Sequence, residues 1–405
     1  MRLRRWQAGR GGGTNPDGAV RYERLKAATA ETGIKFFELG QPGQGIVHVM
    51  APELGLVQPG MTLICGDSHT CTNGALGALA FGIGSSEITH ALATQTLLQR
   101  KPRTMNIQIR GELAPGVFAK DVGLFLIGLL GARAGTGYAV EFSGRVVSAL
   151  SVESRMTLCN LSIELGAKMG MIAADDKTFA YLRGKPFSPE ASRWTEALAQ
   201  WQQDVSDSDA VFDLLHVVDG DSIGPMMTWG TSPEQVIEID KRIPSLDEFE
   251  PGDARDGVDA ALRYMALRPG ARLVGTPVDR VFIGACTNAR LSDLREAARL
   301  LDGKRIAANV CAWVVPGSEQ VKRDAEHEGL DAIFRSAGFE WREPGCSMCV
   351  AANGERAGPG ERVVSTSNRN FVGRQGPGVR THLASPASAA AAALAGEIVD
   401  PREVN

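Results

Sequence analysis

The stretch VDRVFIGACTN, residues 278–288, contains the pattern that decides the fold. Its short apolar run, Val281–Ile283, predicts a buried strand that enters a polar turn. The following segment, LSDLREAARLLDG, predicts a helix that ends at Gly303. A strand, a turn and a helix in succession are typical of α/β proteins, so we expect parallel or mixed sheets flanked by helices.

The same succession occurs along the rest of the chain. A chain of 405 residues is too long for one core. The pattern places domain boundaries after residues 102 and 272, which gives three predicted domains, 1–102, 103–272 and 273–405. Further strands are expected at residues 34–39, 61–65, 105–109 and 308–318. Further helices are expected from about Ser86, over 319–338 and over 386–399. A linker is expected around 240–275.

Composition limits the possible partners and the cellular compartment. The chain is 43% hydrophobic and 22% charged, with a net charge of −4, so nothing favours nucleic acid or an anionic membrane. The most apolar stretch, residues 124–132, is too short to span a membrane and predicts a buried core helix. Seven scattered cysteines do not form a disulfide framework, so we expect a reducing cytoplasm with thiols available for metal.

Three cysteines stand in glycine-containing turns. Cys286 belongs to GACTN, and Cys346 and Cys349 belong to PGCSMC. Three thiolates are one short of the four ligands that a closed zinc or iron–sulfur site needs. A distant histidine would complete a zinc site, whereas an iron–sulfur cluster with one open iron would act as a Lewis acid. Free thiols are the third possibility, and spacing alone leaves all three open.

Two histidines stand in contrasting surroundings. In CGDSHT, Asp67, Ser68 and His69 bring an acid, a hydroxyl and an imidazole onto one turn after a strand. These residues suit acid–base chemistry, and they equally suit a turn that caps the next segment. His48 lies in the apolar stretch GIVHVM, where a histidine of the core is the alternative to a functional one.

Two further motifs contain candidate polar groups. Asn160 and Glu164 are four residues apart, which predicts that they share one helix face. A buried glutamate there would need a partner, and a solvated one would not. STSNRNFVGRQGPGVRTH, residues 365–382, has few apolar residues and includes Arg369, Arg374 and Arg380. Arginine binds carboxylates through two parallel hydrogen bonds, so the stretch is either a carboxylate site or a polar surface loop.

Five motifs, taken together, resemble the aconitase superfamily in order and spacing: GDSHT, CNLSIELGA, FIGACTN, PGCSMC and STSNRNFVGR. The resemblance runs from about Gly33 to the C-terminus and implies a three-domain aconitase-like fold. It is greatest to the hydro-lyases of leucine biosynthesis, which interconvert 2-isopropylmalate and 3-isopropylmalate through isopropylmaleate. Relatives of the homoaconitase or methylmalate/citraconate type share the same motifs.

The resemblance also implies roles for individual residues. Cys286, Cys346 and Cys349 would bind three irons of one [4Fe–4S] cluster per chain. The fourth iron, without a cysteine, would bind the hydroxyl and a carboxylate of a small hydroxy acid. Asn160 and Asn368 would lie beside the cluster. The other implied site residues are His48 paired with Asp67, His69 paired with Glu164, and Ser68, Arg369 and Arg374 on the substrate carboxylates.

The chain departs from the family pattern in two places. The family has a glutamine and an Asp-His pair upstream of the region that matches His48, and no Asp-His dipeptide precedes His48 here. We therefore expect a truncated or wrongly started N-terminal domain, with an inactive cluster-binding remnant as one alternative. Nothing after Arg374 supplies the family's swivelling domain with its catalytic serine, so a separate small subunit is implied. A pure electron carrier is disfavoured, since it would close its cluster with a fourth cysteine.

Overall fold

A computed structural model describes residues 16–351 and 353–404. Residues 1–15, the start of the N-terminal domain that was expected to be truncated or wrongly started, lie outside this described part. The chain separates into two compact units. Unit 1 comprises Met1–Met50 and Pro225–Asn405, and unit 2 comprises Ala51–Gly224. Within the described part, no helix is both long and apolar enough to cross a membrane.

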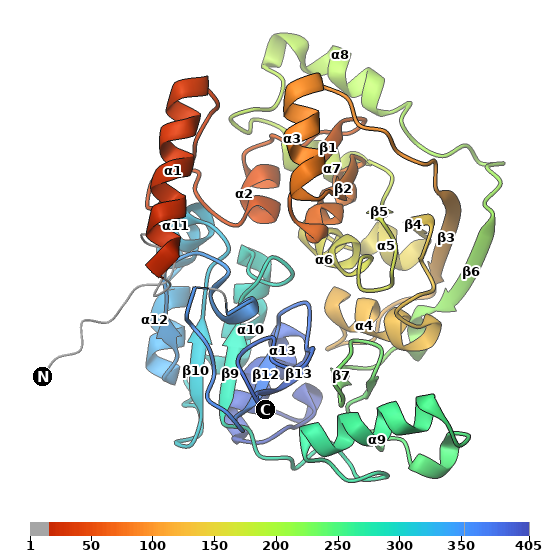
Figure 1. The fold of residues 1–405 in the computed structure, drawn as a ribbon, viewed down its shortest axis with the longest axis vertical. Coiled ribbons are helices and arrows are strands. Elements are labelled where there is room, and N and C mark those ends of the chain that lie inside the picture. Colours follow the sequence, from red (N-terminus) through yellow and green to blue (C-terminus); the bar gives the residue numbers. More distant parts are fainter. Residues whose placement is uncertain (1–15, 352, 405) are drawn as a thin grey trace, which may run out of the picture. The chain divides into compact units, whose positions relative to one another are not determined.

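Unit 1 is built around a parallel sheet in the order β11-β10-β9-β12-β13 (Figure 1). Its strands are β9 (Arg280–Ile283), β10 (Cys311–Val314), β11 (Glu340–Trp341), β12 (Arg362–Ser365) and β13 (Arg380–Leu383). The chain moves outward from β9 through β10 to β11, then returns to place β12 on the other side of β9. The strand order therefore reverses between β9 and β12. In open parallel sheets, such a reversal forms a ligand-binding crevice at the carboxyl ends of the strands.

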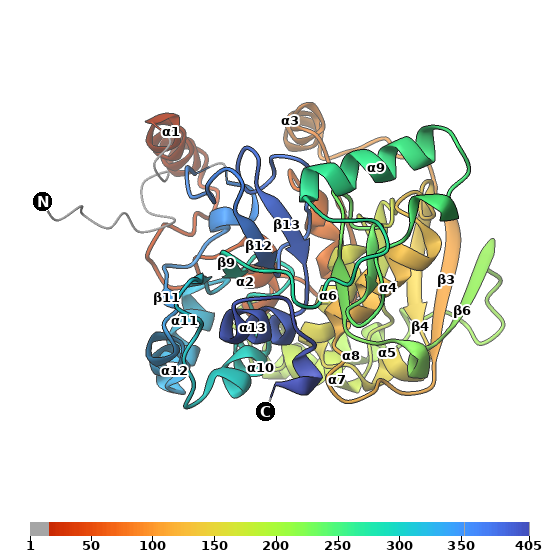
Figure 2. The same cartoon turned by 90° about the horizontal axis from the view of Figure 1, so that it is seen from below.

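Four helices of unit 1 cover one face of this sheet (Figure 2). They are α10 (Leu291–Leu301), α11 (Glu319–His327), α12 (Leu330–Ala337) and α13 (Pro386–Ala395). Successive side chains of a strand point to opposite faces. Val281 and Ile283 accordingly join the core with these helices, while Phe282 faces the other side and packs with Met348 and Cys349. The segment that carries Cys349 is thus held against the sheet by apolar packing.

The remaining elements of unit 1 are not strands of this sheet. They are α1 (Pro16–Thr32), the antiparallel pair β7 (Met226–Thr228) and β8 (Val236–Glu238), α9 (Asp253–Met265), and the short 3₁₀ helices η3 (Leu246–Glu248), η4 (Ser347–Cys349) and η5 (Pro401–Glu403). Helix α2 (Val47–Glu53) spans the boundary between the two units.

Unit 2 contains two parallel sheets. The larger has the order β5-β4-β3-β6 and the smaller pairs β1 with β2. The strands are β1 (Thr62–Cys65), β2 (Leu79–Gly82), β3 (Arg103–Arg110), β4 (Tyr138–Ser143), β5 (Met169–Met171) and β6 (Leu214–Asp219). The helices are η1 (Ser68–Leu76), α3 (Ser85–Thr94), α4 (Ala119–Leu130), α5 (Arg145–Ala149), α6 (Val152–Leu161), α7 (Asp176–Leu182), α8 (Ala191–Trp201) and η2 (Gly220–Ser222).

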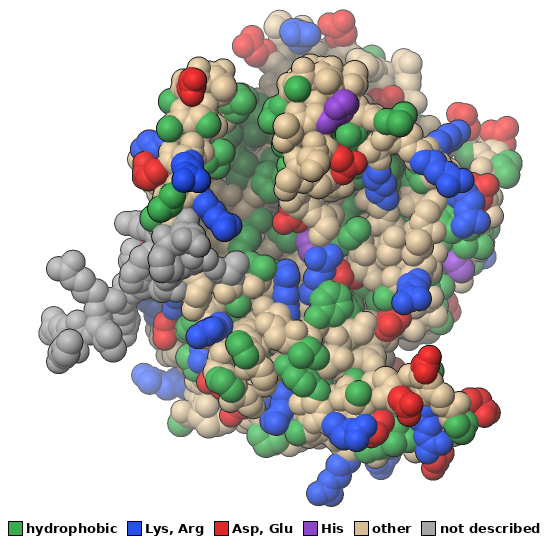
Figure 3. Space-filling model, viewed as in Figure 1, with side chains coloured by type: hydrophobic (Ala, Val, Ile, Leu, Met, Phe, Trp, Pro, Cys, Tyr) green, Lys and Arg blue, Asp and Glu red, His purple; other side chains and the backbone are tan. Residues whose placement is uncertain are grey.

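The two sheets of unit 2 are covered to different extents. Eight of the twelve residues of α4 are buried, but in the apolar stretch at residues 124–132 only Leu124, Leu126 and Ile127 are, and Leu129 is 57% exposed. The expected buried core helix is therefore confirmed only for the first part of this stretch. In contrast, α3 has no buried residue. Its surface carries hydrophobic side chains (Figure 3), among them Leu92, which is 63% exposed. Helix α3, which follows the β1–β2 pair, therefore lies on the surface of unit 2.

The structure confirms an α/β fold with parallel sheets flanked by helices and corrects several elements. Residues 34–39 form no strand. The helix expected over 319–338 divides into α11 and α12 at Gly329, whose φ of +75° favours glycine. The expected linker contains α9. The helix expected from about Ser86 is confirmed as α3, which begins at Ser85.

The division into three domains stays a prediction. Each of the stretches 1–102, 103–272 and 273–405 contributes one main parallel sheet of its own. The compact units group these stretches differently, because residues up to Met50 join unit 1.

Candidate functional site

The loops after β9 and β12 are tied together at the strand-order reversal. The Thr366 N–H donates to the Phe282 carbonyl at 3.0 Å. The Thr366 hydroxyl accepts from the Gly284 N–H at 2.9 Å and donates to the Gly284 carbonyl at 3.0 Å. Cys286 lies two residues after Gly284, and Asn368 lies two residues after Thr366. These bonds therefore hold the loop that carries Cys286 beside the loop that carries Asn368.

Two of the predicted ligand thiols meet at the side chain of Asn368. Its Nδ2 lies 3.4 Å from Cys286 Sγ, and its Oδ1 lies 3.4 Å from Cys349 Sγ. Asn368 is fully buried, and both thiols are nearly so. Cys346 is exposed, and its carbonyl accepts from the Cys349 N–H at 3.0 Å. The structure thus brings all three cysteines and Asn368 to one edge of the sheet.

Backbone strain is concentrated in the same loops. Among the described residues, five that are not glycine have a positive φ. Gln95 and Ala266 follow the last turns of helices α3 and α9, where this conformation is common. The other three are Ala285 (φ +73°), Ser347 (φ +45°) and Ala351 (φ +53°), each within two residues of a predicted ligand cysteine. Such strain gathers at functional sites, because surrounding structure must enforce it.

The backbone at Cys346 is shaped to receive negative charge. Cys346 has right-handed helical angles, φ −74° and ψ −28°, and Ser347 follows in the left-handed region. This alternation turns successive N–H groups toward one concave side, an arrangement found at phosphate and iron–sulfur sites. The loop therefore suits an anionic group that carries thiolates and sulfides.

The arrangement of the ligands favours a cluster over a single zinc ion. Within residues 16–351 and 353–404, no three His, Cys, Asp or Glu side chains converge closely enough to share one metal ion. A zinc site would need its donors about 2.0–2.3 Å from one point. A cluster distributes its cysteine ligands over separate irons. Thiols grouped at one edge without converging on one point fit the second arrangement.

The two predicted substrate arginines lie in the loop that follows Asn368. Arg374 donates through Nε to the Cys349 carbonyl at 3.0 Å, which holds its guanidinium beside the cysteine loop. Arg369 is half-buried between Asn368 and Asn370. Asn370 donates to the Gly230 carbonyl at 2.7 Å, so the backbone of Arg369 is fixed on both sides.

Arg380 does not join this loop. It lies in β13 and donates to the carbonyls of Tyr264 and Gly360. It therefore supports the sheet and α9, and only the first two arginines of this stretch remain candidates for substrate binding.

Sequence reasoning missed Arg290, which connects His48 to the cysteine loop. Arg290 is 2% exposed and donates to the carbonyls of Cys286 at 2.9 Å and Thr287 at 2.8 Å. It also lies 3.4 Å from the His48 carbonyl. His48 itself is buried in α2. The sequence contained one signal for this residue, since Arg290 directly precedes the first turn of α10. A cation is unfavourable at a helix N-terminus unless other bonds hold it.

In unit 2, His69 lies between two carboxylates. Its Nε2 is 2.9 Å from Glu164 Oε1, and both side chains are buried. Its Nδ1 is 3.4 Å from Asp67 Oδ1, which also accepts from the His69 N–H at 2.7 Å. Asp67 therefore caps η1, as expected if these residues form a capping turn. It also faces the imidazole, as expected if they serve acid–base chemistry. Carboxylates that face both ring nitrogens fix the orientation of the imidazole.

The surroundings of His69 are fixed by buried amides and hydroxyls. Asn160, fully buried in α6, donates to Thr72 Oγ1 at 2.8 Å, and the Thr72 hydroxyl donates to the His69 carbonyl at 2.6 Å. Glu164 lies in the turn after α6 rather than on the same helix, which corrects the expected shared helix face. Ser68 is half-buried and immediately precedes His69 as the first residue of η1.

The predicted site residues are divided between the two units. The unit 1 members are His48, Cys286, Cys346, Cys349, Asn368, Arg369 and Arg374, and the unit 2 members are Asp67, Ser68, His69, Asn160 and Glu164. The expected pair of His48 with Asp67 joins residues of different units and stays a prediction.

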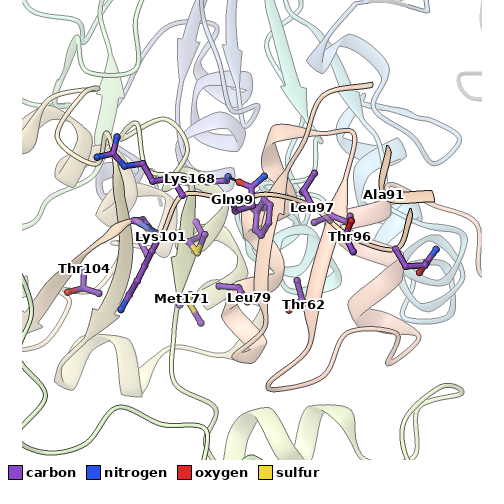
Figure 4. A pocket seen from close by; sticks show the side chains of 17 residues that line it. Thr62, Leu79, Ala91, Thr96, Leu97, Gln99, Lys101, Thr104, Lys168 and Met171 are labelled. Carbon is purple, nitrogen blue, oxygen red and sulfur yellow. Dashed lines mark hydrogen bonds between the residues drawn. The ribbon is translucent and has the colours of Figure 1, made fainter. Parts of the chain in front are cut away.

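A cavity of about 640 Å³ in unit 2 is separate from these residues (Figure 4). Apolar side chains of β1, β2, β4 and β5 line one part of it, and residues 91–102 line another. At its rim, Lys168 bonds to Gln99 and lies 4.5 Å from the centre of the Phe81 ring. None of the predicted site residues lines this cavity, so we do not place the substrate there.

These features define an α/β protein with a thiol-lined strand-order reversal and a separate histidine–carboxylate group. The family model for aconitase (aconitate hydratase) matches residues 14–396. The chain therefore belongs to the aconitase family, and this membership implies an iron–sulfur cluster.

Named relatives narrow the comparison. The 3-isopropylmalate dehydratase large subunit 1 of Bradyrhizobium diazoefficiens is 58% identical over 390 residues, which cover 96% of this chain and 82% of the relative. The 3-isopropylmalate dehydratase large subunit of Roseiflexus castenholzii is 54% identical over 385 residues, or 95% and 82% of the two chains. Among solved structures, holo-form aconitase X of Thermococcus kodakaraensis matches 89% of this chain and 73% of its own, at 13% identity and a TM-score of 0.45.

Proposed function

We propose that the chain is the large subunit of a 3-isopropylmalate dehydratase, a hydro-lyase of leucine biosynthesis. It would interconvert 2-isopropylmalate and 3-isopropylmalate through isopropylmaleate. The observation that carries this proposal is the meeting of Cys286 and Cys349 at the amide of Asn368, at the strand-order reversal. Relatives of this name at 58% and 54% identity support the choice of substrate.

Three cysteines of this chain would hold one [4Fe–4S] cluster and leave one iron without a cysteine. The donor set fits, since the three thiols occupy strained loops and the backbone at Cys346 and Ser347 turns its N–H groups toward one side. When bound, the cluster supplies a Lewis acid for the substrate hydroxyl and a carboxylate. Asn368, fully buried, would donate a hydrogen bond from its amide Nδ2 to the Cys286 sulfur.

The chain's own cations would bind the substrate carboxylates. Arg374 donates its Nε–H to the Cys349 carbonyl, so its two Nη groups would bind a substrate carboxylate. Arg369 lies between two anchored asparagines, which limits the entropy that it loses on binding. Ser68 would add a hydroxyl donor from unit 2.

The histidine–carboxylate group would handle the proton that accompanies the leaving hydroxyl. Dehydration removes a proton from one carbon and hydroxide from its neighbour, and rehydration returns both in the opposite positions. Hydroxide leaves more readily as water, so a proton donor is needed. His69, held by Glu164 at 2.9 Å and facing Asp67, can hold and pass on that proton. His48 is the second candidate of this kind.

The base that removes the carbon-bound proton would come from a separate small subunit. The relatives are named as large subunits, which implies such a partner. The finer prediction is a swivelling domain that carries a catalytic serine. A cytoplasmic location stays the prediction from the cysteine content.

Reconstitution tests the proposal directly. The chain would be loaded anaerobically with iron and sulfide, mixed with a small subunit of this enzyme class, and supplied with 3-isopropylmalate. We expect isopropylmaleate absorbance to appear, and to be lost in Cys286→Ser. Cys311→Ser is the matched control, because Cys311 lies at the start of β10 and its sulfur accepts a hydrogen bond from Arg280 at 3.1 Å.

Other outcomes of this experiment would contradict the proposal. An intact cluster without turnover on any hydroxy acid would favour the inactive remnant. Faster turnover of a homoaconitase or methylmalate/citraconate substrate would keep the reaction class and replace the substrate.

A further inference from the structure

Among the residues that the structure describes, none makes a hydrogen bond with the hydroxyl of Ser347. Ser347 itself is only 2% exposed. Burying a hydroxyl without a partner is unfavourable, so nearly all buried hydroxyls in native proteins are paired. The position of Ser347 in the fold therefore needs an explanation.

The backbone of Ser347 is also held in an unfavourable conformation. Its φ of +45° lies in the left-handed region, which glycine adopts without cost and serine does not. A serine in this place combines a strained backbone with a buried, unpaired hydroxyl. Both costs are explained if the hydroxyl has a bonding partner that is not part of the protein.

The neighbours of Ser347 indicate the chemistry of that partner. Ser347 stands between Cys346 and Cys349, within the single turn that the Cys349 N–H closes on the Cys346 carbonyl. Met348, the next residue, is fully buried in an apolar cluster. The turn thus offers sulfur ligands on both sides of the hydroxyl and apolar packing behind it.

We propose that the Ser347 hydroxyl donates a hydrogen bond to a sulfur of the iron–sulfur cluster and raises its reduction potential. This inference rests on the proposed function, because it requires a cluster held by the three cysteines. Adding an electron makes the cluster sulfurs more negative, so a hydrogen bond to sulfur stabilises the reduced form more than the oxidised form. Removing the hydroxyl should therefore make the midpoint potential more negative.

Two substitutions separate the hydroxyl from the backbone strain. Ser347→Ala removes the hydroxyl and keeps the strain, whereas Ser347→Gly removes both. We expect the same negative shift of the midpoint potential in both variants, measured by mediated redox titration and electron paramagnetic resonance. Ser388→Ala is the control, because Ser388 is a buried serine of α13 whose hydroxyl bonds to Ser385, and its loss should leave the potential unchanged.

A second measurement detects the hydroxyl proton itself. Pulsed electron paramagnetic resonance of the reduced wild-type protein, compared in H₂O and D₂O, should detect an exchangeable proton near the cluster that Ser347→Ala lacks. Unchanged potentials with full iron and sulfide content, or no such proton in the wild type, would overturn the inference. Failure of the wild-type chain to bind any cluster would instead overturn the proposed function.

Discussion

Replacing Thr366 with valine tests whether one hydroxyl holds the two loops at the strand-order reversal. Thr366 is fully buried, and its Oγ1 bonds both to the N–H and to the carbonyl of Gly284, at 2.9 and 3.0 Å. Valine keeps the shape of threonine and makes neither bond. Each buried backbone group left without a partner costs about 1–3 kcal/mol. We therefore expect Thr366→Val to lower the free energy of unfolding by about 2–6 kcal/mol, since two such groups lose their partner.

The matched control is Thr366→Ser, which keeps the hydroxyl and loses one methyl group, at about 1 kcal/mol. Urea denaturation compares the two variants, and hydrogen exchange at the Gly284 amide localises the change to these loops. We expect faster exchange of that amide in Thr366→Val alone. Equal stability of the two variants within about 0.5 kcal/mol, with equal exchange at Gly284, would refute the reasoning.

Three other changes test separate parts of the molecule. Glu164→Gln removes the charge that faces His69. The loss of a charged hydrogen bond worth about 1.5–3 kcal/mol should slow reconstituted turnover about 10–150-fold without altering circular dichroism. A decrease in turnover of less than about threefold would contradict this role. Burial lowers the pKa of His382 from 6.5 to about 3, so folding stability should fall by about 1.4 kcal/mol per pH unit below 6.5, or about 2 kcal/mol at pH 5. His382→Gln should lack this fall in urea titrations at pH 7 and 5. Asp175→Asn leaves the buried Arg155 without its carboxylate partner. In the same titration the free energy of unfolding should fall by only about 1–3 kcal/mol, because the Asp175 side chain is 41% exposed. An unchanged denaturation midpoint would count against a stabilising role of this pair.

The local elements of the fold were predictable where pattern and packing agree. The apolar run Val281–Ile283 becomes β9, and the periodic segment after it becomes α10. Residues 34–39 have strand-like composition, but within the described part of the chain no strand pairs with them, and a strand needs a partner to satisfy its backbone. Gly329 shows the opposite case, since a helical pattern on both sides of it did not reveal the break.

The candidate site was predictable as motifs and not as an arrangement. Nothing local shows that Cys286 and Cys349, 63 positions apart (349 − 286), reach the same amide. That meeting depends on the order of the strands, which follows from packing of the whole sheet. Arg290 was missed for the same reason, because its partners are backbone carbonyls that no sequence pattern marks.

The division of the predicted site between two units leads to one more expectation. Each half is held by hydrogen bonds within its own unit, Thr366 to Gly284 in unit 1 and Asp67 to His69 in unit 2. We therefore expect substitutions in unit 1 to impair cluster binding and substitutions in unit 2 to impair proton transfer. Thr366→Val should lower both iron content and turnover, whereas Glu164→Gln should lower turnover with full iron and sulfide content, measured on the same reconstituted samples. Loss of iron in Glu164→Gln would show that the carboxylate supports cluster binding, and the separation of roles would then be wrong.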